Sequence, residues 1–259
     1  MQILIGDIGN TITKVCLVEL KNFKIKKIFY LNSKRINSNN FLKKKFKKII
    51  KKNNICKITL FSSVVPKYKL LLKKFLKKNY KIILKEIKDI NLKKIIKINI
   101  KNSKQVGSDR IANAVGAYKK FGSNCIILDF GTATTFDVVT KNGTYNGGVI
   151  APGVYLSIKS LTSSADQIPL FSIKSQKKAI GKNTIEALRS GFYWGYAGLI
   201  NNIITKIEKE SRKKHKIIFT GGYADLFKTS ITRKFIIDKN ITIKGIIEIF
   251  KVNRKKLIK

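Results

Sequence analysis

Two segments of the chain share one arrangement of apolar and polar positions. In each, an apolar run reaches an aspartate, a short turn with glycine and threonine follows, and a second apolar run begins. One copy spans Ile3–Val18 and contains Asp7, and the other spans Ile126–Val139 and contains Asp129. Each copy predicts a strand, a tight turn and a strand. The two copies lie more than a hundred residues apart, so together they predict a duplicated fold with one hairpin in each half.

The turn of the second hairpin combines groups that bind phosphate. Gly131 lets the backbone approach a ligand closely, and the N–H groups of such a turn can surround phosphate oxygens. Asp129 and Asp137 add carboxylates beside the turn, where a cation could lie between protein and phosphate. Either hairpin alone is also typical of an ordinary glycine turn, but the pair favours a site shared by two lobes. The hydroxyl-bearing residues of this turn are Thr132, Thr134 and Thr135.

The remaining pattern predicts alternating strands and helices, as in α/β proteins. Apolar residues at helical spacing among lysines predict amphipathic helices, and short apolar runs predict buried strands. Further strands are expected at 24–31, 57–63, 80–84, 144–153 and 216–219, and helices at 40–53, 67–78, 111–120, 154–161, 180–210 and 241–252. These elements divide into an N-terminal lobe, 1–115, and a C-terminal lobe, 116–259, each with one hairpin.

The connecting segments carry expectations of their own. The lysine-rich stretch 86–105 should lie over the site, 162–175 should form a loop, and 253–259 should be a frayed basic tail. The glycine-rich stretch 220–224 is expected to turn into a helix and to contact a nucleotide's sugar or base. One face of the long helix carries three glycines, which indicate close approach of a helix or a ligand. They are Gly191, Gly195 and Gly198.

Composition narrows the function classes. At 259 residues with 44% hydrophobic residues, the chain can form two lobes with separate cores. No apolar run approaches the ~20 residues of a membrane helix, and the first residues lead directly into a strand. We therefore expect a cytoplasmic protein with no membrane partner. Cys16, Cys56 and Cys125 match no metal or disulfide spacing, and Cys16 and Cys125 should be packing residues in apolar strands.

The formal net charge of +41 predicts weak, salt-sensitive binding to polyanions. Lysine is spread over the whole sequence and accompanies abundant isoleucine and asparagine, which is typical of AT-rich coding drift. A dedicated nucleic-acid surface would instead concentrate basic residues on one element with aromatics among them. We therefore expect no specific nucleic-acid partner, although a nucleic-acid-binding or regulatory protein remains an alternative.

Asp109 is the candidate catalytic base. It lies at the start of a predicted helix, where either Ser108 or Asp109 could cap the helix and the dipole keeps a carboxylate ionised. An ionised aspartate can accept a proton from an alcohol during phosphoryl transfer. The guanidinium of Arg110 suits a bidentate contact with carboxylate or phosphate. A plain helix cap and a surface ion pair are the alternatives for these two residues.

Other candidates carry weaker signals. Lys14 follows the first turn and could meet a phosphate, whereas His215 lies among lysines and should be solvated. The chain has no G-x-x-x-x-G-K-[ST] segment, which argues against a P-loop NTPase. No group of histidines and cysteines suggests a transition metal.

Seven short motifs, taken in order, resemble those of type III pantothenate kinases. That family belongs to the actin/Hsp70/sugar-kinase superfamily, and the resemblance extends from about residue 2 to 253. It implies an α/β fold of two ribonuclease-H-like lobes with a nucleotide cleft between them. The motifs are Asp7–Thr11, Ser62–Pro66, Gly107–Ala114, Asp129–Thr135, Gly147–Gly153, Ile180–Thr184 and Thr220–Gly222.

The resemblance also implies an activity, which is ATP-dependent phosphorylation of pantothenate to 4'-phosphopantothenate, the first step towards coenzyme A. It implies a homodimer, Mg²⁺ with the nucleotide, and K⁺ or NH₄⁺ at Asp129. A kinase of another small alcohol is the second alternative. By the same resemblance, pantothenate would bind Gly107, Ser108, Asp109, Arg110 and Thr184, with Asp109 as proton acceptor. ATP would bind Asp7, Ile8, Gly9, Asn10, Thr11, Ile12, Thr13, Lys14 and Thr132.

Overall fold

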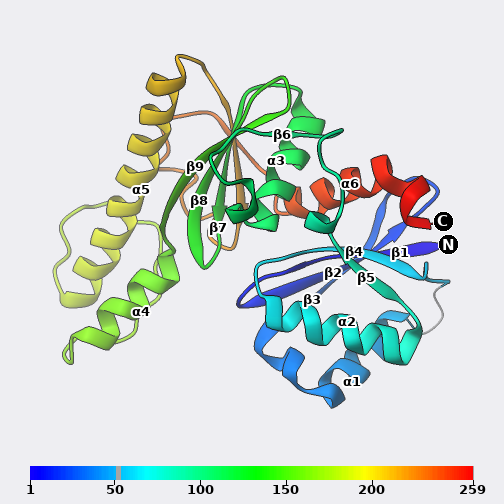
Figure 1. Ribbon diagram of the computed structural model, residues 1–259. Helices are drawn as coiled ribbons and strands as arrows, with labels where there is room; N and C mark the ends of the chain where they lie inside the picture. The colour runs from blue at the N-terminus through cyan, green and yellow to red at the C-terminus, as the bar shows by residue number, and fades with distance from the viewer. Residues whose placement is uncertain (51–53, 259) are drawn as a thin grey trace. The chain divides into compact units, whose positions relative to one another are not determined.

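The computed structural model describes residues 1–50 and 54–258 (Figure 1). The chain forms two compact units. The first consists of Met1–Lys120, Gly143–Tyr145 and Asn240–Lys259, and the second of Phe121–Asn142 and Asn146–Lys239. This division differs from the predicted lobes 1–115 and 116–259 mainly because the C-terminal helix belongs to the first unit.

The first unit is built on a five-stranded sheet with the order β3-β2-β1-β4-β5. The first three strands are antiparallel, and β4 and β5 continue the sheet parallel to β1. Strands β1 and β4 are buried on both faces over most of their length, as is typical of strands inside a covered sheet. The strands are β1 (Gln2–Ile8), β2 (Ile12–Glu19), β3 (Ile25–Asn32), β4 (Ile58–Ser63) and β5 (Ile83–Glu86).

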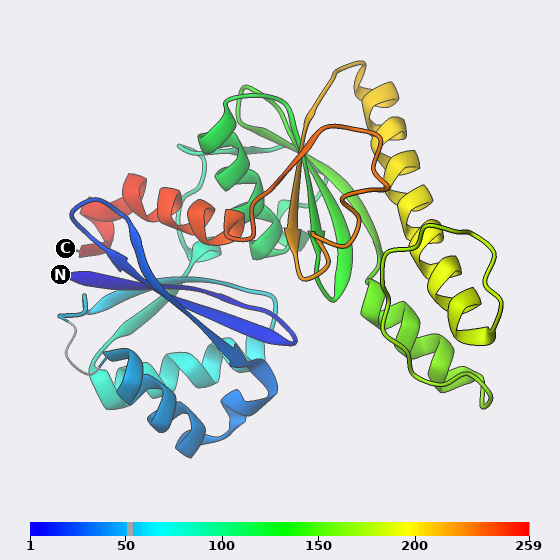
Figure 2. The same ribbon diagram turned by 180° about the vertical axis from the view of Figure 1, so that it is seen from behind.

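Helices cover both faces of this sheet (Figures 1 and 2). One face carries α1 (Asn39–Ile50) and α2 (Pro66–Tyr80), whose Phe46 and Phe75 rings lie 5.5 Å apart in the core. The other face packs against α6 (Ile241–Ile258), which contacts β1 and β4. The predicted helix 40–53 extends into residues 51–53, which lie outside the described residues.

Helix α6 packs against α3 (Ser108–Phe121) without space for side chains at the crossing. A Cβ on Gly116 or Gly245 would collide with the backbone of the facing helix. Beside the crossing, buried Thr242 Oγ1 donates to Asn113 Oδ1 at 2.7 Å. The predicted frayed tail at 253–259 is wrong up to Ile258, because α6 continues there with Asn253 and Leu257 buried.

The second sheet has the strand order β11-β10-β7-β8-β9-β6. Strand β7 is antiparallel to β8 and parallel to β10, and β10 is parallel to β11. The order β9-β8-β7-β10-β11 thus repeats β3-β2-β1-β4-β5, and this confirms the predicted duplication. The short β6 (Lys97–Ile98) pairs with Thr144–Tyr145, inside the first unit. The other strands are β7 (Cys125–Phe130), β8 (Ala133–Val139), β9 (Thr144–Pro152), β10 (Lys216–Gly221) and β11 (Phe235–Ile237).

The core of the second unit lies between this sheet and two helices, α4 (Val154–Ser164) and α5 (Thr184–Ser211). Its aromatic centre includes Phe130, Phe219 and Phe227, and the rings of Phe130 and Phe227 stack at 5.6 Å. Among the described residues no helix combines the length and apolar character needed to cross a membrane.

Several local predictions are corrected by tertiary structure. The stretch after Gly221 forms turns and no helix, and Leu70, an apolar residue of the predicted amphipathic helix 67–78, is 52% exposed. At the three glycines of α5 no described residue lies within 4 Å of a Cβ built there, so the close approach of a helix or ligand stays a prediction. His215 is half-buried, and burial lowers the pKa of its imidazole. Cys16 and Cys125 are buried in strands, which confirms their packing role.

Candidate active site

The first hairpin joins β1 to β2 through an exposed tip. The Gly9 N–H donates to the Ile12 carbonyl at 3.2 Å and closes the turn, and Asn10 and Thr11 at the tip are exposed. Asp7 lies directly opposite Lys14 in the strand register. The turn therefore presents backbone groups at its tip, with a carboxylate and an ammonium group on its two strands.

Two of the eight residues of this hairpin that are expected to contact ATP have side chains directed into the protein. Ile8 is fully buried, and so is Thr13, whose hydroxyl lies 2.8 Å from the Ser33 hydroxyl. These two residues can offer a ligand only their backbone groups.

Asp7 has a partner on the neighbouring parallel strand. Ser62 Oγ donates to Asp7 Oδ1 at 2.6 Å, and the two residues face each other in the β1–β4 register. A bond of this length to a carboxylate fixes the carboxylate's orientation. Sequence analysis placed Ser62 in a motif but gave it no partner. The available signal was a pair of serines at the end of a buried strand that runs parallel to β1.

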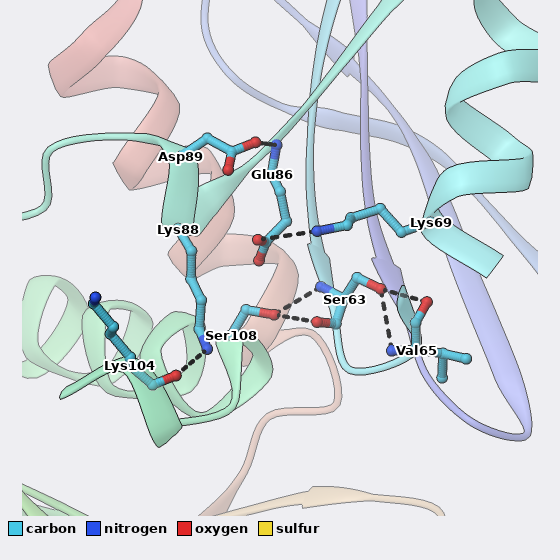
Figure 3. A network of polar contacts seen from close by, with 8 residues as sticks. All are labelled: Ser63, Val65, Lys69, Glu86, Lys88, Asp89, Lys104 and Ser108. Atoms are coloured by element: carbon cyan, nitrogen blue, oxygen red, sulfur yellow. Dashed lines mark hydrogen bonds and ion pairs between the residues drawn. The ribbon is translucent and has the colours of Figure 1, made fainter. Parts of the chain in front are cut away.

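The next residue along β4 connects the sheet to α3 (Figure 3). Ser108 Oγ accepts a hydrogen bond from the Ser63 N–H at 2.7 Å and donates to the Ser63 carbonyl at 2.8 Å. The Ser108 side chain is fully buried, so its hydroxyl serves as a link between α3 and β4 and neither caps the helix nor faces a substrate. We call this pair of bonds the Ser63–Ser108 link.

Asp109 follows this link at the start of α3 and is half-buried. Its Oδ1 accepts from the Arg110 N–H at 2.8 Å. Burial raises the pKa of the Asp109 carboxyl, while the N–H and guanidinium of Arg110 and the charge of Lys88 act in the opposite direction. Loss of hydration is thus the largest effect on the pKa of this carboxyl, and ionisation of Asp109 at the helix terminus stays a prediction. A higher pKa makes the ionised carboxylate a stronger base.

Gly107 makes this position of the carboxylate possible. A Cβ at residue 107 would lie 2.5 Å from Asp109 Oδ1 and 3.6 Å from Arg110 Cγ. Such a separation from oxygen is far inside van der Waals contact, so any side chain would displace the Asp109 carboxylate. Glycine is required here for space, and the φ angle of residue 107 is not in the left-handed region.

The lysine-rich connection 86–105 passes close to this group of residues. Lys88 Nζ donates to the Lys104 carbonyl at 3.1 Å (Figure 3), and its charge acts on Asp109. At the start of the connection, Glu86 is only 5% exposed and lies 3.6 Å from Lys69 Nζ. The connection is thus anchored to α2 at one end and brings a cation towards Asp109.

The second hairpin repeats the geometry of the first. Asp129 lies opposite Thr135 on β8 and Thr220 on β10, as Asp7 lies opposite Lys14 and Ser62. Its turn is one residue shorter, because the Gly131 N–H donates to the Ala133 carbonyl at 3.1 Å. Thr132 is exposed at the tip. Thr134 and Asp137 are fully buried, so these two predicted members of the phosphate turn are not available at its surface.

The surroundings of Asp129 fit a hard cation better than a transition metal. A Cβ at Gly221 would lie 2.7 Å from Asp129 Oδ1 and 2.6 Å from the Phe130 carbonyl oxygen, so only glycine leaves room beside these two oxygens. Within 1–50 and 54–258, no group of three His, Cys, Asp or Glu residues could hold a metal ion. A carboxylate supplemented by carbonyl oxygens is a donor set typical of alkali and alkaline-earth cations.

Thr184 begins α5 in the second unit and is exposed. Asn183 caps the helix by accepting from the Glu186 N–H at 2.9 Å. Thr184 lines a recess of about 610 Å³ whose wall is largely apolar. The recess is also lined by Gly191, Phe192, Gly195 and Tyr196 of α5. The structure thus groups Asp7, Lys14 and Gly107–Arg110 in the first unit, and Asp129, Thr132 and Thr184 in the second.

Comparison with known proteins gives one family. The sequence profile of type III pantothenate kinases matches residues 3–206. A type III pantothenate kinase from Pelagibacter ubique is 53% identical over 246 residues, which cover 95% of this chain and 97% of that one. One from Jannaschia sp. is 46% identical over 58% of each chain.

Solved structures with low sequence identity share the fold. A conserved Baf family protein from Campylobacter jejuni has a TM-score of 0.61 and 21% identity over 97% of this chain and 99% of that one. The activator of 2-hydroxyisocaproyl-CoA dehydratase from Clostridium difficile, solved with ADPNP, has a TM-score of 0.56 and 10% identity over 99% and 97% of the two chains. The fold is therefore that of the actin/Hsp70/sugar-kinase superfamily. With the family profile over most of its length and a near full-length relative at 53% identity, the chain belongs to the type III pantothenate kinases, the enzymes that phosphorylate pantothenate on the way to coenzyme A.

Proposed function

We propose that Asp109 is the base that accepts the proton of the pantothenate hydroxyl while that hydroxyl attacks the γ-phosphorus of ATP. One observation carries the assignment. The Asp109 carboxylate is half-buried with a raised pKa, and the Ser63–Ser108 link joins its helix to β4, beside the strand that bears Asp7. A base whose pKa is higher than that of a free carboxyl, and whose position is fixed, suits proton transfer near neutral pH.

ATP is assigned to Asp7–Lys14 and Thr132. The exposed tip of the first hairpin supports this, because its backbone N–H groups can bind phosphate oxygens and Lys14 adds a positive charge. Ile8 and Thr13 contribute backbone only, since their side chains are buried. The cytoplasm is the compartment that supplies ATP, and we place the enzyme there.

Two cations are assigned. Mg²⁺ would accompany the ATP phosphates and neutralise charge there. Asp129, with the backbone oxygens around it, would hold K⁺ or NH₄⁺, whose contribution is positive charge without proton transfer. The oxygen donor set and the space kept by Gly221 support this assignment.

Pantothenate is assigned to Gly107, Asp109, Arg110 and Thr184. The substrate carries a carboxylate, and the planar guanidinium of Arg110 suits a bidentate contact with that group. Thr184 is exposed at the edge of an apolar recess, where its hydroxyl can bind a polar part of the substrate. Ser108 is assigned to positioning alone, because its hydroxyl is already used by Ser63.

We propose that the same recess is the contact surface of a homodimer. The glycines of α5 leave open space on their face of the helix, Phe192 and Tyr196 line it, and Trp194 is partly exposed nearby on the helix. An apolar helix face with small residues can accept a second helix closely. Sedimentation of the purified chain tests the dimer, and Gly195→Trp should yield the monomer.

A coupled assay of ATP turnover with pantothenate tests the catalytic assignment. Asp109→Asn should lower the rate by about 10²–10⁴-fold and leave ATP affinity unchanged, because the base is lost and the phosphate turn is kept. Asp166→Asn, at an exposed aspartate of the second unit, is the matched control and should turn over normally. A full rate in Asp109→Asn would refute the base assignment, and a rate independent of K⁺ and NH₄⁺ would refute the cation at Asp129.

A further inference from the structure

A second recess lies in the second unit, at the amino ends of its three parallel strands. It measures about 540 Å³ and is lined by residues at or just before the starts of β7, β10 and β11. The phosphate turn of the second hairpin follows the carboxyl end of β7, so the recess is at the opposite end of the same strand. The lining residues are Gly122–Asn124, Lys141, Lys214–Ile217 and Lys234–Ile236.

The charge of this recess is entirely positive. Lys141, Lys214, Lys216 and Lys234 line it, and no aspartate or glutamate does. Among the residues that the structure describes, none of these four lysines forms an ion pair. The nearby carboxylate of Glu208 is already engaged, because it accepts from Arg233 Nε and from the His215 N–H, each at 3.2 Å. The positive charge of the four lysines is therefore left uncompensated by protein groups.

The arrangement differs from the lysine-covered helices elsewhere in the chain. On α1, the lysines are exposed along a single helix. Here four lysines from three separate segments line one hollow. The lining also includes the apolar residues Ile217, Phe235 and Ile236, and a volume of this size is that of an ordinary small-molecule site.

We propose that this recess binds a small organic polyanion carrying at least two phosphate groups, whose apolar part contacts Phe235 and Ile236. A single phosphate cannot balance four lysines, whereas two phosphate monoester groups together carry about three to four negative charges near neutral pH. Nucleic acid is the other polyanion to consider, but a hollow of about 540 Å³ suits a compact molecule better than an extended strand. The site is separate from the phosphate turn, which lies at the other end of β7.

Binding of inorganic pyrophosphate, measured by titration calorimetry at physiological salt, tests the proposal. A non-hydrolysable ATP analogue at saturating concentration first fills the kinase site. The test variant replaces Lys141, Lys214 and Lys234 by glutamine and keeps Lys216, whose Nζ lies 4.8 Å from the centre of the Phe121 ring. The control variant replaces Lys43, Lys44 and Lys47 of α1 by glutamine, which removes the same charge from an exposed helix.

Wild-type protein should bind one pyrophosphate per chain, and orthophosphate more weakly. The test variant should bind it about tenfold or more weakly, since each exposed ion pair changes affinity by roughly two- to fivefold, and the control variant should match wild type. Equal weakening in both variants would show general attraction to a basic protein and overturn the proposal. Absence of saturable binding in wild type, or preference for an oligonucleotide over pyrophosphate, would also overturn it.

Discussion

The Ser63–Ser108 link predicts that a single substitution lowers both the stability of the fold and the catalytic rate. Ser108→Ala removes both hydrogen bonds, of 2.7 and 2.8 Å, and leaves the Ser63 N–H and carbonyl without their partner. The substitution removes one oxygen from a fully buried side chain and favours helix formation, so no new steric or helical defect obscures the result.

The size of the effect follows from the two bonds. Each contributes about 1 kcal/mol net, and a buried donor left unsatisfied adds a further cost. We expect the free energy of unfolding to fall by about 2–3 kcal/mol and the melting temperature to fall by roughly 4–12 °C in a protein of this size. Because α3 then loses its connection to β4, Asp109 should move, and a displacement of about 1 Å can lower the rate about 10²-fold.

The assay combines thermal unfolding with steady-state kinetics. Ser108→Ala should lower kcat by about 10–100-fold with an unchanged KM for ATP, because Ser62 still holds Asp7. Ser63→Ala is the matched control. It also removes two hydrogen bonds, both to Val65 at 3.2 Å, but keeps the backbone groups that bind Ser108. A Ser108→Ala enzyme with reduced melting temperature and normal kcat would show that the link only stabilises the fold.

Three further predictions concern the same unit. Gly107→Ala should lower kcat by about 10²-fold with little change in melting temperature, because its Cβ would displace the Asp109 carboxylate; a normal rate in the coupled assay would contradict this. The acid limb of the pH–rate profile should lie above the ordinary pKa of aspartate, because burial raises the pKa of Asp109. The raised pKa also means that the folded protein binds this proton more tightly than the unfolded chain does. The free energy of unfolding should therefore fall as pH rises through the pKa of Asp109 in the folded protein. Asp109→Asn should therefore raise the melting temperature at neutral pH but not well below the ordinary aspartate range, and an equal change at both pH values would refute the sign. Gly245→Ala should destabilise the protein by about 3 kcal/mol or more, measured by urea unfolding, because its Cβ would collide with the backbone of α3. Gly222→Ala, whose Cβ would meet only the Phe130 carbonyl oxygen at 3.9 Å, is the control.

The features that could be predicted from the sequence depend on residues close together in the chain. The two hairpins follow from an aspartate, a glycine turn and apolar runs within about fifteen residues, and the strand order of both sheets confirms them. The helical spacing of Phe41, Leu42, Phe46 and Ile49 placed α1 and its buried face correctly. Asp109 and Arg110 were also found by local signals, a short motif before a helix.

What the sequence could not predict depends on contacts between distant residues. Ser108 and Ser63 are 45 positions apart, and no periodic pattern indicates that one hydroxyl binds the other's backbone. The ionisation of Asp109 depends on burial that only the fold creates. The end of α6 was missed for the same reason, since Asn253 and Leu257 lie in a lysine-rich stretch and are ordered by packing.

The place of α6 has a consequence for synthesis on the ribosome. The helix covers β1 and β4, yet it is translated more than a hundred residues after Met1–Lys120, the main part of its unit. At typical elongation rates of about 5–20 residues per second, the emerging first unit waits roughly ten seconds with the apolar side of that sheet and the glycine face of α3 uncovered. A nascent chain of this kind is a natural client for a chaperone, and a message truncated before residue 240 should yield protein that is degraded or aggregates.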